Sequence, residues 1–250
     1  MFGYAKSRQN AKVLIESGNV LLDGKPIAKP SQDIDESIEH NIQISNRPRF
    51  VSRGGEKLDF ALNAFNVNVD GTVCIDIGAS TGGFTDCLLQ RGADRVYAVD
   101  SGCGQLDPSL ELDERVISIE KYNARLMKAE DFPTLFDLAV MDVSFISQTL
   151  LHPGIHEVLK DSGILVSLIK PQFECGRAAL NSKGIVKKPS HHEMAIRRVI
   201  DSAAIVGFSC IGLVKSPIEG GSGNVEFLAI FKKEPSATGT VSDKLIKSVI

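Results

Sequence analysis

The fold of this protein can be inferred from one stretch, TVCIDIGASTGGFTD at residues 72–86. The stretch begins with an apolar run that is typical of a buried strand. A glycine-rich turn follows at Gly78, and the residues from about Gly83 to Arg91 suit a helix. A strand, a tight glycine turn and a helix in this order are typical of the first unit of a nucleotide-binding α/β fold.

The same alternation continues along the chain. Further strands are expected at residues 95–100, 116–119, 136–143 and 163–169, and further helices at 53–65 and 148–160. Continuous apolar runs separated by helices predict a parallel sheet buried on both faces. A helix at 191–206 then leads to GFSCIGLV and NVEFLAIF, which a glycine-rich loop joins. Because such a loop joins antiparallel strands, we expect a Rossmann-like α/β fold with a seven-stranded, mostly parallel sheet whose last strand is antiparallel.

Charge distinguishes between ligands for the glycine turn. The turn lacks the G-x-G-x-x-G spacing of a dinucleotide site. Asp76, next to the turn, would repel a pyrophosphate and attract a cationic amine. S-adenosylmethionine therefore suits the turn better than NAD, with its carboxylate near the N–H groups at the start of the Gly83 helix. Asp100, after the next strand, is placed to accept hydrogen bonds from ribose hydroxyls. A turn that merely packs a helix on a strand is the alternative.

Four charged residues are expected at one edge of the sheet. Asp142 and Lys170 directly follow buried strands, at the carboxyl edge where open α/β sheets bind ligands. Glu226 lies near the start of the antiparallel strand, which falls on the same edge, and Lys57 comes from a helix that can cover it. A structural role explains each residue alone better than catalysis does, but together they could converge beside the ligand.

The first 45 residues have their own turn signals. A helix with Leu14 and Ile15 on its apolar face, capped by Ser7, is expected before a hairpin around Asp23 and Gly24. A short strand with Ile42 and Ile44 follows, and NRPRFVS breaks the pattern. We therefore divide the chain into residues 1–45, a linker at 46–52, a large domain at 53–234 and a polar tail, with room for a short helix, at 235–250.

The motifs together resemble the TlyA (hemolysin A) family of ribosomal RNA 2'-O-methyltransferases, which share the FtsJ-type methyltransferase fold. The resemblance rests on SRGGEKL, DIGASTGGFTD, YAVDSGCGQL, MDVSF, KPQFE, GRAALNSKGIV and SPIEGGSGNVEFL, after a start that resembles part of an S4 RNA-binding domain. It implies methylation of cytidine ribose in ribosomal RNA. It also implies a catalytic tetrad of Lys57, Asp142, Lys170 and Glu226, and contacts to S-adenosylmethionine from Gly78, Ala79, Ser80, Gly82, Gly83, Phe84 and Asp100. The charge argument adds Asp76 to these contacts, and the need to remove the proton of a ribose hydroxyl makes Lys170 the candidate general base.

Uneven charge supports a polyanionic partner. The net charge is −3, yet residues 1–30 carry five Lys or Arg against two acids, and residues 170–198 carry seven against two. Basic patches on an acidic protein are typical of nucleic-acid binding, with solvated surface charge as the alternative. The candidate contacts to ribosomal RNA are Lys6, Arg8, Lys12, Lys25, Arg53, Arg177 and Lys183.

Composition bears on the cellular compartment and on alternative functions. Five cysteines without a CxxC pair are typical of a reducing compartment, and no signal peptide or membrane span is recognisable, so we expect a cytoplasmic protein without a metal. Cys175 as a nucleophile and a histidine metal site at His191 and His192 are weaker interpretations. Phe173 suits either stacking on a flipped base or core packing. A non-catalytic RNA-binding protein, a membrane-active haemolysin and an NAD dehydrogenase remain as alternative functions.

Overall fold

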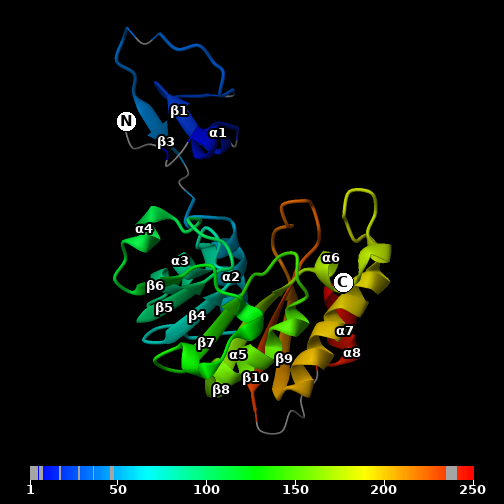
Figure 1. Cartoon of the computed structure of the whole chain (residues 1–250). Helices are drawn as coiled ribbons and strands as arrows, with labels where there is room; N and C mark the ends of the chain where they lie inside the picture. Colours follow the sequence, from blue (N-terminus) through cyan, green and yellow to red (C-terminus); the bar gives the residue numbers. More distant parts are fainter. Residues whose placement is uncertain are drawn as a thin grey trace. The chain divides into compact units, whose positions relative to one another are not determined.

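The chain forms two compact units. The computed structural model describes residues 5, 8–16, 18–27, 29–35, 37–45, 48–234 and 241–250. The units are Met1–Arg49 and Phe50–Ile250 (Figure 1). Each has its own hydrophobic core, and each is described separately below.

The described part of the first unit contains one helix and a three-stranded antiparallel sheet of order β2-β1-β3. Its elements are α1 (Arg8–Glu16), β1 (Val20–Leu22), β2 (Lys25–Pro26) and β3 (Ile42–Ile44). Asp23 and Gly24 both have positive φ, at 51° and 78°, which the predicted two-residue hairpin requires. Leu14, Val20 and Ile27 form the buried core. Ser7, the predicted helix cap, lies outside the described residues.

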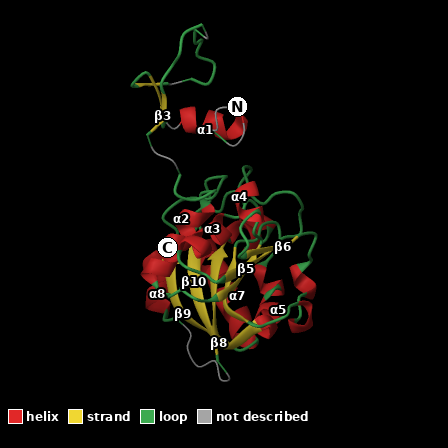
Figure 2. Ribbon diagram, turned by 90° about the vertical axis from the view of Figure 1, so that its left-hand side faces the viewer, coloured by secondary structure: helices red, strands yellow, loops and turns green. Residues whose placement is uncertain are grey.

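The second unit alternates strands and helices around one sheet, which Figure 2 shows as neighbouring strands with helices packed beside them. Its elements are α2 (Gly54–Ala64), β4 (Val73–Ile77), α3 (Gly83–Gln90), β5 (Arg95–Val99), α4 (Pro108–Glu111), β6 (Val116–Ile119), β7 (Phe136–Met141), α5 (His152–Val158), β8 (Leu159–Ile169), α6 (Pro171–Glu174), α7 (Pro189–Ile205), β9 (Phe208–Lys215), β10 (Phe227–Lys233) and α8 (Asp243–Val249).

The order of the strands confirms the predicted fold class. The seven strands lie in the order β6-β5-β4-β7-β8-β10-β9. Strands β4 to β8 pair in parallel, whereas β10 runs antiparallel to both β8 and β9. Phe227 of β10 pairs with Ile169 of β8. Glu226 and Lys170, the next residues outward, therefore leave the sheet opposite each other.

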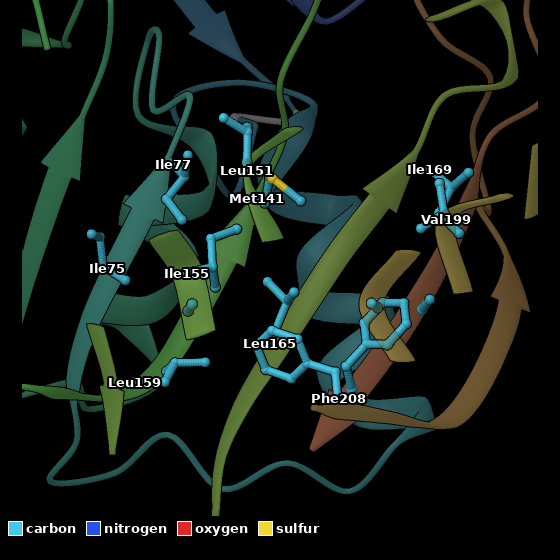
Figure 3. Packing of buried hydrophobic residues seen from close by; sticks show 14 of the residues in the cluster. Ile75, Ile77, Met141, Leu151, Ile155, Leu159, Leu165, Ile169, Val199 and Phe208 are labelled. Carbon is cyan, nitrogen blue, oxygen red and sulfur yellow. The ribbon is translucent and has the colours of Figure 1, made fainter. Parts of the chain in front are cut away.

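Apolar side chains cover both faces of the sheet. On one face the strands pack against α5 and α7, as Figure 3 shows for Ile155 and Val199. On the other face, α2 and α3 contribute Leu58 and Leu88, both fully buried. Burial of each such side chain stabilises the fold by about 1.5–3 kcal/mol. This packing on two faces fixes the strand ends that carry the polar residues of the site.

Two segment boundaries differ from those expected. The helix expected at 148–160 is a 3₁₀ turn at Gln148–Leu150 followed by α5, which ends at Val158. Leu159 already pairs with Phe136 in the sheet, so strand hydrogen bonds replace helical ones. In the expected linker, Phe50 is buried against Gly55, where a Cβ would overlap the phenyl ring. Residues 50–52 therefore belong to the second unit.

The chain end also belongs to the second unit. Residues 235–240 lie outside the described part, and α8 follows them. The Ser242 side chain caps this helix by accepting a hydrogen bond from the Leu245 N–H. Ile246 is buried in the same core cluster as α7. The polar tail expected at 235–250 thus includes an amphipathic helix that packs on the domain.

Candidate active site

The glycine turn after β4 approaches the end of β7 most closely at Gly78. Its φ is 84°, and a Cβ there would lie 2.8 Å from the main-chain oxygen of Asp142. Both observations exclude a side chain at this position. The Gly78 N–H donates to the Val99 carbonyl over 2.9 Å, and the Ser80 N–H donates to Asp100 Oδ2 over 2.8 Å. Hydrogen bonds to the neighbouring strand thus hold the turn in place.

The second half of the turn begins α3 and meets α2. A Cβ at Gly83 would overlap the Ser52 hydroxyl and lie 3.0 Å from the Gly55 nitrogen. This close approach brings α2, which carries Lys57, up to the turn. Gly82, a predicted cofactor contact, faces Leu106 and Leu110 of the neighbouring loop and helix α4. Gly82 therefore allows the turn to pack closely against these two leucines, and it lines neither of the cavities described next.

Two cavities meet at this edge of the sheet. The Asp100 cavity has a volume of about 400 Å³ and extends from the turn past the ends of β5 and β7 to residues 122–125. The Lys57 cavity, of about 280 Å³, lies on the α2 side of the turn. Gly78, Ser80, Asp142 and Ser144 line both cavities. A ligand in one cavity would therefore lie next to a ligand in the other.

Asp76 lies behind the turn and lines neither cavity. Contrary to the expectation, it is inside β4 and points toward α3, where its Oδ2 accepts a hydrogen bond from Thr85 Oγ1 over 2.7 Å. Its Oδ1 is buried without a hydrogen-bond partner among the described residues. Burial raises the pKa of Asp76 to about 7, and the Thr85 hydrogen bond opposes that rise. A buried, unpaired carboxylate oxygen of this kind favours a cationic group nearby.

Asp100 is the first residue after β5 and lines the Asp100 cavity. Its two carboxylate oxygens accept hydrogen bonds from the Ser80 N–H and, over 2.7 Å, from the Gly102 N–H. Each oxygen has a further lone pair. Asp100 thus orders two loops around the cavity and can still accept hydrogen bonds from a hydroxyl-bearing ligand.

Lys57 and Glu226 form a buried ion pair. Lys57 Nζ donates to Glu226 Oε2 over 2.5 Å, and the two residues are 8% and 3% exposed. Lys57 lines the Lys57 cavity, whereas Glu226 contacts that cavity through Lys57. A buried ion pair is stable only while both partners remain, because a single charge there would be uncompensated. Glu226 thus holds the Lys57 ammonium at the cavity wall.

Lys170 forms the second ion pair of the site. Its Nζ lies 2.6 Å from Asp142 Oδ1 and donates to Ser144 Oγ over 2.8 Å. All three residues line the Lys57 cavity. Ser144 has no counterpart among the residues predicted from sequence, although it lies in the MDVSF motif two residues after Asp142. The structure thus brings together all four charged residues expected at this edge and adds a hydroxyl.

Phe145 is a second residue that the sequence did not single out. It is 93% exposed, lines the Asp100 cavity and has a φ of 64°, which is costly for a bulky side chain. Its ring centroid lies 5.3 Å from that of Phe173, which is half-buried. Of the two rings, Phe145 is the one presented to solvent at the mouth of the site.

The predicted RNA contacts are distributed over both units. Arg53 is exposed and lines the Lys57 cavity, whereas Arg177 and Lys183 are exposed on the segment between α6 and α7. That segment is fastened by the buried Asn224, whose Oδ1 accepts from the Val186 N–H over 2.9 Å. In the first unit, Arg8, Lys12 and Lys25 are exposed, and Lys6 lies outside the described residues.

The surroundings of Cys175 and His192 favour structural roles over catalysis or metal binding. Burial raises the pKa of the Cys175 thiol to about 11, and its Sγ donates to the His191 carbonyl, so the thiolate that a nucleophile needs is disfavoured. His192 is buried and within 3.1 Å of the Val186 carbonyl. Across the described residues, no three His, Cys, Asp or Glu side chains gather as metal ligands would.

Both units of the chain are similar to known protein families. The FtsJ-like methyltransferase model matches residues 50–233, and the S4 domain model matches residues 2–37. Hemolysin A of Brachyspira hyodysenteriae is 40% identical over 92% of this chain and 95% of its own length. The 16S/23S rRNA (cytidine-2'-O)-methyltransferase TlyA of Mycobacterium tuberculosis is 40% identical over 90% of this chain and 84% of its own length.

A solved structure, "Putative hemolysin from Streptococcus thermophilus", superposes with a TM-score of 0.82 at 44% identity, covering 99% of this chain and 90% of that one. No helix in the described part of the chain has the length and hydropathy that a membrane crossing requires. The family model, the relatives and the strand order agree with one another. This chain belongs to the FtsJ-like methyltransferase family, among the relatives that include TlyA and Hemolysin A.

Proposed function

We propose that this protein transfers a methyl group from S-adenosylmethionine to the ribose 2'-hydroxyl of a cytidine in ribosomal RNA. The observation that carries the proposal is the convergence of two lysine–carboxylate pairs on the Lys57 cavity, which shares a wall with the Asp100 cavity. The TlyA relative is by name a cytidine-2'-O-methyltransferase of 16S and 23S rRNA, which supports the choice of substrate.

The Asp100 cavity suits S-adenosylmethionine. At about 400 Å³ it lies within the usual range of roughly 300–1,000 Å³ for small-molecule sites. Asp76 Oδ1, buried behind the turn and unpaired among the described residues, complements a cationic amine. Asp100 can accept ribose hydroxyls, and Gly78 leaves room beside the turn. The bound donor supplies a methyl carbon on a sulfonium. Its proposed contacts are Gly78, Ser80 and Asp100 in the Asp100 cavity, then Ala79, Gly83 and Phe84 on the Lys57 side of the turn, where the two cavities adjoin. Asp76 would act on the amine from behind the turn, and Gly82 supports the turn.

The Lys57 cavity suits the acceptor ribose. A 2'-hydroxyl must lose its proton as its oxygen attacks, and Lys170 Nζ is the proposed proton acceptor. Only the neutral amine can accept that proton, and Asp142, 2.6 Å from Nζ, orients the lysine toward the hydroxyl. Lys57, held by Glu226, adds a positive charge that favours the developing oxyanion. Holding the two reactants in adjacent cavities is the larger contribution, since effective molarities reach about 10⁵ M or more.

Basic and aromatic residues suit the rest of the RNA. Arg53 at the cavity and Arg177 and Lys183 on the segment after α6 would contact phosphates. The exposed Phe145 ring offers a surface on which a splayed base can stack. The S4 domain, with Arg8, Lys12 and Lys25, would bind a further part of the RNA. Such a substrate places the protein in the cytoplasm.

The test is methyl transfer from radiolabelled S-adenosylmethionine into separated ribosomal subunits, followed by mapping of the modified ribose. We expect label in a cytidine 2'-O-methyl group, and none with Lys170→Ala. Donor binding without transfer to either subunit would favour a non-catalytic RNA-binding protein. Label on a base carbon or nitrogen would overturn the proposed chemistry.

A further inference from the structure

The contacts of Lys170 involve two separate segments. Asp142 and Ser144 lie on residues 142–148, which lead from β7 into the 3₁₀ turn. Lys170 lies on residues 167–174, which span the end of β8 and α6. Its Nζ reaches both partners, at 2.6 Å and 2.8 Å. Whatever holds these segments together therefore sets the position of Lys170 relative to its partners.

A buried carboxylate joins the two segments. Glu174 is 2% exposed; its Oε2 accepts from Ser147 Oγ over 2.6 Å and its Oε1 accepts from the Gln148 N–H over 2.9 Å. Gln148 is equally buried, and its Oε1 accepts a hydrogen bond from Ser167 Oγ on β8. Residues on both sides of Lys170 thus contact the same turn. We call Glu174, Ser147, Gln148 and Ser167 the brace.

The brace is linked rigidly to the site on both sides. The Phe173 N–H donates to the Lys170 carbonyl over 3.0 Å, so a single helical turn separates Lys170 from Glu174. On the other segment, the left-handed backbone of Phe145 is a conformation that persists only where its surroundings hold it. The brace begins two residues later, at Ser147.

A carboxylate is a costly way to fill this space. Burial raises the pKa of Glu174, although the hydrogen bonds from Ser147 and Gln148 oppose the rise. Arg198 contacts the main-chain oxygen of Glu174 and does not donate to the carboxylate. Apolar residues would fill the same volume without this desolvation. What they could not do is accept two directed hydrogen bonds from the turn that follows Ser144.

We propose that Glu174 is a positioning residue for methyl transfer, which acts by fixing the 142–148 segment so that Asp142 and Ser144 hold Lys170 Nζ at the cavity wall. The inference rests on the proposed function, since it takes Lys170 to be the proton acceptor. Glu174 itself lines neither the Asp100 cavity nor the Lys57 cavity.

The experiment compares Glu174→Ala with Glu174→Gln in the full chain. In the alanine variant we expect the single-turnover rate at saturating RNA to fall about 100-fold, because displacements near 1 Å cost that much. Calorimetric affinity for the donor should fall much less than the rate, because Gly78, Ser80 and Asp100 also line the Asp100 cavity and are not held by the brace. Glutamine has the same shape, can accept from the Gln148 N–H and donate to Ser147 Oγ, and should restore most of the rate. Hydrogen exchange should accelerate in residues 142–148 of the alanine variant alone.

The controls separate positioning from stability. Asp137→Ala breaks a half-buried ion pair with Lys160 and a hydrogen bond from the Val73 N–H at the other end of the sheet, so it reports what loss of stability does alone. A Glu174→Ala rate equal to wild type, an effect no larger than that of Asp137→Ala, or unchanged exchange in residues 142–148 would overturn the proposal. If Glu174→Ala does not fold, Ser147→Ala removes one of the two bonds and must show the same changes in smaller measure. Wild-type protein without methyl transfer would instead refute the proposed function, while the exchange measurement still decides whether the brace holds the segment.

Discussion

Lys57 Nζ lies 2.5 Å from Glu226 Oε2, although 169 residues separate them in the chain. Lys57 reaches this position because α2 packs closely on α3 at Gly55 and Gly83. Glu226 reaches it because β10 runs antiparallel to β8. The ion pair beside the Lys57 cavity thus depends both on the packing of α2 against α3 and on the direction of β10.

This ion pair predicts a non-additive pattern of stability. Lys57→Met leaves Glu226 buried without a partner and should lower the free energy of unfolding by about 3–5 kcal/mol. The double variant Lys57→Met, Glu226→Leu removes both charges and should be more stable than Lys57→Met, yet equally unable to transfer methyl groups. Urea unfolding and methyl-transfer assays measure the two effects.

A half-exposed pair serves as the control for that cycle. Lys160 Nζ lies 2.7 Å from Asp137 Oδ1, with the side chains 44% and 34% exposed. Lys160→Met should cost at most about 1 kcal/mol, because water screens such pairs. If Lys57→Met costs no more than Lys160→Met, the Lys57–Glu226 pair is not desolvated as described.

Lys170→Ala should abolish methyl transfer and leave donor affinity nearly intact, since Lys170 lies in the Lys57 cavity and not in the Asp100 cavity. Ser144→Ala keeps the Lys170–Asp142 pair and removes one hydrogen bond to a charged group. Such a bond is worth about 1.5 kcal/mol, so the rate should fall about 10-fold. Single-turnover kinetics with calorimetry of the donor measure both; wild-type turnover of Lys170→Ala would refute its role.

Donor affinity should depend on pH through Asp76. Its pKa is raised to about 7 by burial, and a cationic amine nearby would favour the ionised form. Binding should therefore release a proton below pH 7, and affinity should weaken as pH falls through that value. Calorimetry in buffers of different ionisation enthalpy measures the proton count. Asp76→Asn should bind more weakly and lose the dependence; an unchanged profile would contradict contact with the amine.

His152 should make the fold sensitive to mild acid. It is the first residue of α5 and fully buried, with Nδ1 3.1 Å from Oγ of Ser202 on α7, and burial lowers its pKa from 6.5 to about 4. The folded state therefore binds fewer protons than the unfolded state between these values. The free energy of unfolding is therefore highest above pH 6.5. It decreases as pH falls toward 4, by up to about 3 kcal/mol from His152. His152→Asn should flatten this part of the pH dependence of urea unfolding; the same slope in the variant would assign it to other groups.

Periodicity in the sequence predicted the fold well because each strand and helix shows a local pattern. The apolar runs at Val73–Ile77 and Phe136–Met141 are strands, as predicted, and the glycine-rich connection before β10 does make that strand antiparallel. The expected helix end was wrong at Leu159, where strand pairing with Phe136 replaces helical hydrogen bonds. The expected linker was too long, because Phe50 is buried in the core of the second unit.

The candidate site was predicted less completely. The expected topology placed Asp142, Lys170, Glu226 and Lys57 at one edge of the sheet, and the family resemblance then selected the same four. Their catalytic roles, like the donor and RNA contacts, remain predictions. Ser144 and Phe145 were missed, because nothing local distinguishes a serine that reaches a lysine or a phenylalanine with positive φ.

By itself, the sequence determined the order of strands and helices along the chain and the place of the glycine turn, since both depend on neighbouring residues. It also indicated the edge of the sheet at which charged residues gather, because these residues directly follow or precede apolar strands. Tertiary structure decided which charges pair, that Asp76 points behind the turn and that Glu174 contacts Ser147 and Gln148. The physical reason is that hydrogen bonds and ion pairs act over about 3 Å, and only strand register and helix packing bring distant residues that close.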